Sequence, residues 1–338
     1  MSVEIAGESG DRARNILKSR DDPRPTIFAR EVGTHADSPT FRVSEGASCW
    51  WTNPNEPFGP EKLRPRIEPW LTALWQSEHL SVLLGSGLTH AVHRMATGQL
   101  CPGMASAEFG DFRAVVDPAA EESARAVGRN KGNIEDQIRV ANELLRGLEI
   151  LGRIDAASAK KAADLKTKLT EVLAAFADGI LHCERSLLGA KPEQVERAFN
   201  YLVSFLMSFA SRTGTRDRLH LFTTNYDRVI EAGAEAAGMH LLDRFVGSLA
   251  PIFRSSRLDL DLHYNPPGIR GEPRYVEGVA RFTKLHGSLD WMERERNIRR
   301  VGIPLGAGSV APYLEDAGRG AAGAMQLMIY PNAAKDRE

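Results

Sequence analysis

Cysteine is scarce in this sequence, and its three residues are far apart. They stand at Cys49, Cys101 and Cys183, and no two of them form a C-x-x-C pair. A zinc ribbon needs closely spaced cysteine pairs, so this spacing excludes one. It also argues against a disulfide framework. Cys183 follows His182, but neighbours in a helix point to different sides, so we interpret Cys183 as a structural residue rather than a nucleophile with its base.

Long apolar runs and an excess of charge of one sign are also lacking. No run of about 18 apolar residues exists, and the first residues lack the apolar core of a signal peptide. The formal net charge of −1 indicates no overall basic field for nucleic acid or for an acidic membrane surface. We therefore expect a cytoplasmic globular protein that neither enters the membrane nor binds nucleic acid directly.

The first 60 residues are rich in Pro, Asp, Arg and Ser and show little periodicity. We predict an irregular N-terminal arm over residues 1–60, whose aromatic stretch ASCWWTNPNEPFGP docks on the body of the protein or on another subunit. Apolar residues then recur at helical spacing from 61 to 79. A helix is predicted there, with Pro65 and Pro69 bending it or delaying its start.

A strand, a glycine turn and a helix are predicted next. The segment LSVLL at 80–84 is typical of a strand that is buried on both faces of a parallel sheet. Gly85, Ser86 and Gly87 follow it and precede a stretch with helical spacing. This order forms the first half of a nucleotide-binding unit, in which phosphate oxygens approach the glycine backbone and the free N–H groups of the helix. Short glycine turns also join strands to helices without any ligand.

Helical periodicity dominates residues 104–212, and internal glycines are few. We interpret this stretch as a helical module inserted between sheet elements. Asn133 with Asp136 predicts the start of one helix. Glu135 and Asp136 are candidates for catalytic carboxylates, although acidic residues in a first helical turn are more often partners of the helix dipole.

After residue 212, short apolar segments that are typical of strands occur again. The sequence predicts a strand at 219–222, a helix at 227–237, and further strands in MHLLDRF, in YVEGVARFTKLHGS and in AMQLMIYPNAAK, the last stopped by Pro331. MERERNIRRV is expected to form a charged hairpin. The predicted fold is therefore α/β: a Rossmann-like parallel sheet built from residues 61–103 and 213–338, with the helical module inserted.

Three predicted strand ends carry unusual groups: GSGLT at 85–89, TTNYD at 223–227 and KLHGS at 284–288. Their order resembles the sirtuin family of NAD-binding proteins, where a glycine turn, a T-x-N-x-D segment and an H-G dipeptide surround the dinucleotide. The segments FTTNYDRVIE, KLHGSLDW and MIYPNAAK are similar to the bacterial sirtuin-like branch of antiphage defence systems. Deacetylase sirtuins carry a four-cysteine zinc ribbon, which this chain lacks, so no zinc is expected and protein deacetylation is disfavoured.

The resemblance implies that NAD+ is the substrate and assigns the site. Asn225 and His286 would be catalytic, and the dinucleotide would be bound by Gly85, Ser86, Gly87, Thr89, Thr224, Asp227 and Gly287. Cleaving the nicotinamide–ribose bond passes through an oxocarbenium-like ribose. Asn225 has a donor and an acceptor for a water and a ribose hydroxyl, and His286 can accept a proton. Gly287 would leave room for the ribose.

Each of these residues also has a plain structural explanation. An asparagine before a helix is usually an N-cap, and Asn225 could cap the helix that follows it. A histidine at a strand end is usually a satisfied surface residue, and an acid such as Asp227 suits a first helical turn. The shared order of the three motifs favours site roles.

Three functions follow as hypotheses. The first is an NAD+ glycohydrolase that produces nicotinamide and ADP-ribose as an effector of antiviral defence by abortive infection. The second is a non-catalytic module that senses NAD+ or ADP-ribose and controls a partner. The third is a protein deacylase or ADP-ribosyltransferase. A glycohydrolase effector must be silent until triggered, which implies a homo-oligomer or a partner. The resemblance implies a HerA-type ATPase or an Argonaute-like protein as that partner.

Overall fold

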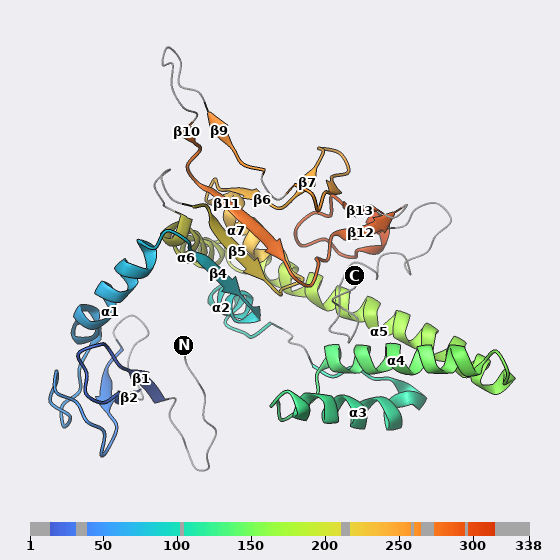
Figure 1. Cartoon of the computed structure of the whole chain (residues 1–338), viewed down its shortest axis with the longest axis horizontal. Coiled ribbons are helices and arrows are strands. Elements are labelled where there is room, and N and C mark those ends of the chain that lie inside the picture. Colours follow the sequence, from blue (N-terminus) through green and yellow to red (C-terminus); the bar gives the residue numbers. More distant parts are fainter. Residues whose placement is uncertain are drawn as a thin grey trace. The chain divides into compact units, whose positions relative to one another are not determined.

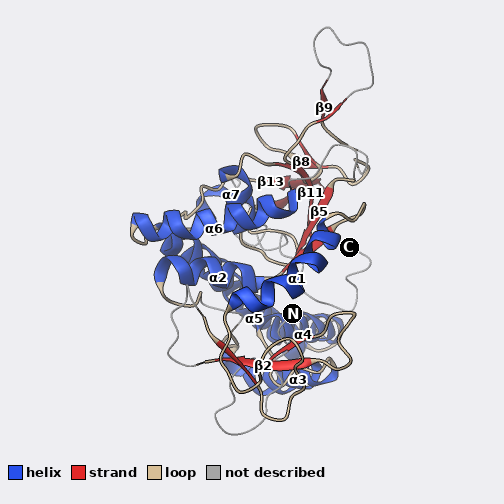
Figure 2. Cartoon of the chain, turned by 90° about the vertical axis from the view of Figure 1, so that its left-hand side faces the viewer, coloured by secondary structure: helices blue, strands red, loops and turns tan. Residues whose placement is uncertain are grey.

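The computed structural model divides the chain into two compact units, residues 1–78 and 79–338 (Figure 1). Figure 2 distinguishes the helices and strands of both units. The predicted boundary after residue 60 is wrong, because the helix at 60–75 belongs to the first unit. The structure describes residues 14–31, 39–101, 105–210, 217–257, 260–264, 274–294 and 297–314.

The first unit contains a three-stranded antiparallel sheet in the order β1-β2-β3. Its strands are β1 (Arg14–Leu17), β2 (Thr26–Arg30) and β3 (Phe41–Val43). Buried Phe28, Val43 and Phe58 form its core, and the Trp51 ring packs edge-on against Phe58 at 5.3 Å. The predicted irregular arm is therefore wrong for these strands. Each strand is at most five residues long, too short for a clear alternation in the sequence.

Helix α1 (Pro60–Trp75) confirms the helix predicted after the arm. It begins at Pro60, in its first turn, where the missing N–H costs nothing. Pro65 and Pro69 lie inside the helix, so neither of them delays its start. Arg66 on this helix forms an ion pair with the buried carboxylate of Asp22. The pair ties α1 to the loop between β1 and β2 within the first unit.

The second unit is built around a four-stranded parallel sheet in the order β4-β5-β11-β6, as the predicted α/β fold requires. Its strands are β4 (Ser81–Leu84), β5 (Leu219–Thr223), β11 (Val279–Lys284) and β6 (His240–Leu242). Both Leu84 and Lys284 pair in register with Thr223. The carboxyl ends of β4, β5 and β11 therefore end at the same level, and the segments that follow them emerge side by side.

Three helices share a hydrophobic core with one face of this sheet: α2 (Ser86–Thr97), α6 (Pro192–Ala210) and α7 (Val229–Ala236). Leu219 and Leu221 of β5 lie in this core beside Phe282 of β11. On β4, however, Leu83 points the other way and is 68% exposed. Within the described part of the chain, β4 is thus covered on one face, and the predicted burial on both faces is wrong.

A second core lies among the helices of the predicted module. These are the short 3-10 helix η1 (Gly110–Phe112), α3 (Arg113–Ala126), α4 (Ile134–Leu151) and α5 (Ala156–Leu188). The predicted limit at residue 212 is too late, because α6 packs into the core of the sheet with α2 and α7. An apolar helical stripe shows that a helix is partly buried, but not against which neighbour.

A second sheet, in the order β12-β13-β8-β7, is antiparallel. The hairpin of β12 (Trp291–Arg294) and β13 (Asn297–Arg300) confirms the predicted charged hairpin. The remaining described elements are β7 (Phe245–Val246), β8 (Ile252–Phe253), the antiparallel pair of β9 (His263–Tyr264) and β10 (Arg274–Tyr275), and α8 (Ala311–Leu314).

The strand predicted in AMQLMIYPNAAK, before Pro331, lies outside the described residues. No described helix combines the length and the apolar character that crossing a membrane requires.

Candidate functional site

A cavity of about 480 Å³ lies where the segments after β4, β5 and β11 meet helices α4 and α5. Open α/β sheets bind their ligands at this end of the strands. The structure brings six of the predicted site residues to its wall: Ser86, Thr89, Thr224, Asn225, Asp227 and His286. The other three predicted residues, Gly85, Gly87 and Gly287, are not among the residues that line it.

The glycine turn after β4 has an open surface. Gly85 is the extended N-cap of α2, which begins at Ser86. A β-carbon added at Gly85 or at Gly87 would meet no heavy atom of the described chain within 4 Å. The first N–H groups of α2 lack helical acceptors, so this turn can take an anionic group such as a phosphate. Gly287 differs, since its φ of 75° itself favours glycine.

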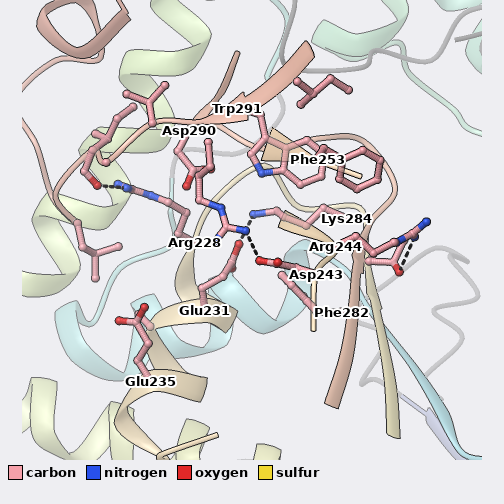
Figure 3. Close-up of a pocket in the computed structure, with 18 residues that line it drawn as sticks. Arg228, Glu231, Glu235, Asp243, Arg244, Phe253, Phe282, Lys284, Asp290 and Trp291 are labelled. Carbon is pink, nitrogen blue, oxygen red and sulfur yellow. Dashed lines mark hydrogen bonds and ion pairs between the residues drawn. The ribbon is translucent and has the colours of Figure 1, made fainter. Parts of the chain in front are cut away.

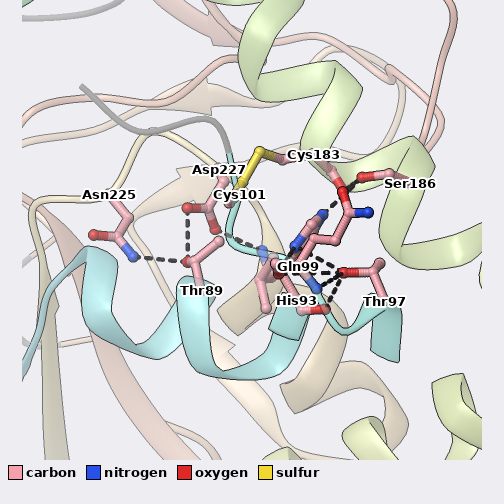
Figure 4. Close-up of a disulfide and its surroundings, with 10 residues drawn as sticks. Thr89, His93, Thr97, Gln99, Cys101, Cys183, Ser186, Asn225 and Asp227 are labelled. Atoms are coloured by element: carbon pink, nitrogen blue, oxygen red, sulfur yellow. Dashed lines mark hydrogen bonds between the residues drawn. A yellow bond between two sulfur atoms is a disulfide. The ribbon is translucent and has the colours of Figure 1, made fainter. Parts of the chain in front are cut away.

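Asn225, Thr89 and Asp227 form a hydrogen-bonded chain across two strand ends (Figure 4). Nδ2 of Asn225 donates to Oγ1 of Thr89 at 3.1 Å and to the backbone oxygen of Gly85 at 3.1 Å. The Thr89 hydroxyl donates to Oδ2 of Asp227 at 2.8 Å. Oδ1 of Asp227 accepts from the backbone N–H of Val229 at 3.0 Å, which fastens the start of α7.

This network decides between the explanations offered for Asn225. The N-cap residue of α7 is Arg228, so Asn225 does not cap that helix. Its side chain instead holds the glycine turn, and the residue is only 5% exposed. Asp227 keeps the structural role expected of an acid before a helix while it also lines the cavity.

His286 lies beside a carboxylate that the helical module contributes. Its Nδ1 is 3.7 Å from Oε1 of Glu135, and the same Oε1 accepts a hydrogen bond of 2.8 Å from the Tyr226 hydroxyl. Nδ1 of His286 is buried and has no hydrogen-bond partner among the described residues. The Glu135 carboxylate and the His286 ring therefore lie next to each other on the wall of the cavity.

The start of α4 explains how Glu135 reaches the cavity. Asn133 caps the helix, and its Oδ1 accepts from the backbone N–H of Asp136 at 3.1 Å, which completes a capping box. Burial raises the pKa of Asp136, but the bonds from Arg129 and from the Asn133 backbone outweigh it and lower that pKa. The two acids of this first turn therefore have separate roles: Asp136 holds the cap, and Glu135 lines the cavity.

Several cavity residues are absent from the predicted set, and Glu135 and His90 are two of them with ionisable side chains. Glu135 was considered in the sequence mainly as a partner of the helix dipole, and nothing local places it near His286. His90 also lines the cavity, and its buried Nδ1 has no hydrogen-bond partner among the described residues. The spacing of His90, four residues after Ser86 on the same helical face, is a signal that could have identified it.

The spacing of the cysteines argued against disulfides, and this prediction is wrong for one pair. Cys101, after α2, and Cys183, in α5, form a disulfide with a Cα–Cα distance of 5.7 Å, and both line the cavity (Figure 4). Cys49 is free. Cysteines separated by 82 residues carry no local signal of pairing, because only the packing of α2 beside α5 brings them together.

Comparison with models of known protein families finds none that matches this chain. Comparison with curated proteins finds no match either. In the described part of the chain, no group of three or more His, Cys, Asp or Glu side chains is placed to hold a metal ion.

Proposed function

We propose that this protein is an NAD+ glycohydrolase, which cleaves NAD+ to nicotinamide and ADP-ribose. One observation carries the proposal: Ser86 of the glycine turn, Asn225 and His286 meet at one cavity at the carboxyl ends of three parallel strands. The cavity volume of about 480 Å³ lies within the range of small-molecule and cofactor sites. The order of the three motifs, which resembles that of sirtuins, supports the same substrate.

Hydrolysis of the nicotinamide–ribose bond needs a proton acceptor and fixed dipoles, and it needs no strong acid. Nicotinamide leaves as a neutral molecule, and the ribose carbon then takes a bond from the oxygen of a water. The proton of that water must be accepted, and His286 with Glu135 beside it is the proposed acceptor. The start of α2 would hold the pyrophosphate, and Thr224 would border the ribose.

The hydrogen bonds of Asn225 modify its proposed role. Both N–H bonds of its amide are used by Gly85 and Thr89, so the group that can act on a ligand is the carbonyl oxygen Oδ1. This oxygen would accept a hydrogen bond from the attacking water or from a ribose hydroxyl. Loss of Asn225 would therefore disturb the glycine turn as well as the nucleophile.

A binding module without turnover is the second candidate, and the same observation favours it. Both N–H groups of the Asn225 amide bond to the protein itself. Such an asparagine can hold the walls of a binding pocket in place without taking part in catalysis. In this alternative the cavity holds NAD+ or ADP-ribose and controls a partner. Calorimetry with NAD+, followed by chromatography of the recovered nucleotide, separates the two functions: binding without nicotinamide release supports the module.

The glycohydrolase is tested by chromatography of NAD+ incubated with the full chain. We expect nicotinamide and ADP-ribose from the wild type, and a loss of about a hundredfold or more in rate for His286→Ala and for Asn225→Ala. His240→Ala is the matched control, because His240 is exposed on β6 and does not line the cavity. Turnover that is unchanged in both cavity variants would contradict the proposal.

The cellular setting remains part of the proposal. An effector of abortive infection has to be silent until infection, so assembly into a homo-oligomer or contact with a HerA-type ATPase or Argonaute-like partner would trigger it. Incubations over a wide range of protein concentration test self-assembly, since a rate per subunit that rises with concentration indicates an active oligomer.

A further inference from the structure

A second cavity, of about 400 Å³, is lined by residues of β11 and α7 (Figure 3). It shares no lining residue with the first cavity. Its wall comes from α7, from β11, from the start of β12 and from residues of β8 and β13. The proposed glycohydrolase chemistry uses none of these residues. The charged groups and rings in this wall indicate what the cavity can hold.

Three of the four cationic side chains in this wall have anionic partners, and the fourth, Arg244, contacts the Thr283 hydroxyl and the Phe253 ring instead. Nζ of Lys284 is 2.8 Å from Oε1 of Glu231, and Arg228 pairs with the buried Glu184 at 2.6 Å. Arg300 forms an ion pair with Asp243. An anionic ligand would have to displace the carboxylates from these three cations, so the cavity suits a neutral ligand better than a phosphate or a carboxylate.

Two carboxylate oxygens in this wall remain without hydrogen bonds. Oδ1 of Asp290 and Oε2 of Glu231 are buried, and neither has a partner among the described residues. Asp290 is only 8% exposed, and Figure 3 shows it on the same wall as Trp291. A buried acceptor without a donor is costly, so these two atoms favour a ligand that supplies N–H groups.

Aromatic rings complete the wall beside these acceptors. The rings of Phe253 and Trp291 both line the cavity, with centroids 6.1 Å apart and planes inclined by 33°. Such rings offer flat apolar faces against which a planar ligand can lie. A flat ring with N–H donors on its edge would satisfy both parts of the wall.

The backbone supplies an independent sign of a functional site. Arg244 lines the cavity and is the only described residue other than glycine with a positive φ, at 66°. Strained residues of this kind gather at ligand sites. Cζ of Arg244 lies 5.3 Å from the centre of the Phe253 ring, so the strained residue supports the aromatic wall.

We propose that this second cavity binds a nucleobase that carries an exocyclic amino group. The base lies against Phe253 and Trp291, and its N–H groups donate to Oδ1 of Asp290 and Oε2 of Glu231. Burial raises the pKa of Glu231, although Lys284 opposes this, so a donor on Oε2 would also stabilise the ionised carboxylate. Charge is balanced, because the wall contains as many carboxylates as cationic side chains, and a neutral base suits it.

The test is calorimetric titration of the full chain with adenosine, guanosine and cytidine, and with purine riboside, which lacks the amino group. We expect at least one amino-bearing nucleoside to bind, and purine riboside to bind about tenfold more weakly or not at all. Purine riboside needs no change in the protein, so this comparison holds even if a variant folds poorly. Absence of binding by all three amino-bearing nucleosides would overturn the proposal.

Matched variants locate the binding. Asp290→Asn and Glu231→Gln keep the shape of each side chain but change the acceptor, and we expect about tenfold weaker binding in each, with circular dichroism confirming the fold. His240→Ala, which changes neither cavity, should bind the nucleoside as the wild type does. Binding that is lost in Asn225→Ala and kept in Asp290→Asn would assign the nucleoside to the first cavity. That result would overturn this inference and leave the glycohydrolase proposal standing.

Discussion

The hydroxyl of Thr89 donates a hydrogen bond of 2.8 Å to Asp227, a residue 138 positions later in the chain. It joins the helix that follows β4 to the segment that follows β5, and Asn225 donates to the same hydroxyl. The predicted pyrophosphate and ribose regions of the site are therefore one hydrogen-bonded unit. A change in Thr89 acts on both.

Thr89→Val tests this unit. The variant keeps the shape of the side chain but leaves the Asp227 carboxylate and the Asn225 amide each without one partner. We expect a loss of about 1–3 kcal/mol in the free energy of unfolding and weaker NAD+ binding. Urea unfolding and calorimetry measure the two effects. Thr89→Ser, which retains the hydroxyl, should behave as the wild type; equal losses in both variants would show that the methyl group matters and the hydrogen bond does not.

Glu135→Gln tests the carboxylate beside His286. The change removes the negative charge 3.7 Å from Nδ1 and keeps an acceptor for the Tyr226 hydroxyl. For the proposed hydrolysis of NAD+ we expect kcat to fall about ten- to a hundredfold with KM nearly constant, because the protonated imidazole loses its partner. Glu143→Gln, on the exposed side of the same helix, is the control. A kcat equal to that of the wild type would exclude a role for Glu135.

The disulfide gives a prediction on stability. Replacing both Cys101 and Cys183 by serine opens a loop of 82 residues, and we expect the free energy of unfolding to fall by about 2–4 kcal/mol. A reductant should lower the stability of the wild type by a similar amount and leave the double variant unchanged. Cys49→Ser serves as the control. Thiol counting by mass spectrometry after alkylation should find Cys49 alone modified before reduction.

Asp22 gives a prediction on pH dependence. Burial raises its pKa, but hydrogen bonds from Ser19, Trp50 and Arg66 outweigh this and hold that pKa well below the ordinary value of 3.8. A carboxyl whose pKa is lower in the folded state stabilises the protein above its unfolded pKa, and the contribution is lost as the pH falls below about 4. Asp22→Asn should therefore destabilise the first unit at neutral pH and weaken the fall in stability on acidification.

Unfolding of the full chain followed by circular dichroism at several pH values measures this difference. Asp21→Asn is the control, since Asp21 is the exposed neighbour. If Asp22→Asn and the wild type lose stability in parallel between about pH 4 and pH 2, the bonds to Asp22 do not hold its charge.

The elements around the site were largely predictable because their signals are local. The strand LSVLL, its glycine turn and the helix after it occur where expected, since an apolar run, an extended N-cap and helical spacing follow one another directly. The capping box of Asn133 and Asp136 was readable for the same reason. The N-terminal sheet was missed, because strands of three to five residues give too short an alternation.

The site itself was predictable only where its residues follow a strand end. Thr224, Asn225, Asp227 and His286 lie at the ends of adjacent parallel strands, and such ends meet at one edge of a sheet. Glu135 comes from a helix of the inserted module, and the disulfide joins another helix of that module to the segment after α2. The partners of those helices depend on packing. Likewise, α6 carries the same kind of apolar stripe as its neighbours and yet belongs to the core of the sheet.

The sequence by itself determined the elements whose hydrogen bonds and caps close within a few residues: the strand, turn and helix at GSGLT, the start of α4 and the strand that delivers His286. Only the tertiary structure decided that Thr89 joins Asn225 to Asp227 and that Glu135 faces His286. It also decided that Oδ1 of Asp290 is buried without a donor from the described part of the chain. The physical reason is range. A helix cap or a periodic apolar stripe depends only on residues close together in the sequence. A contact between distant segments depends on how whole helices and strands pack.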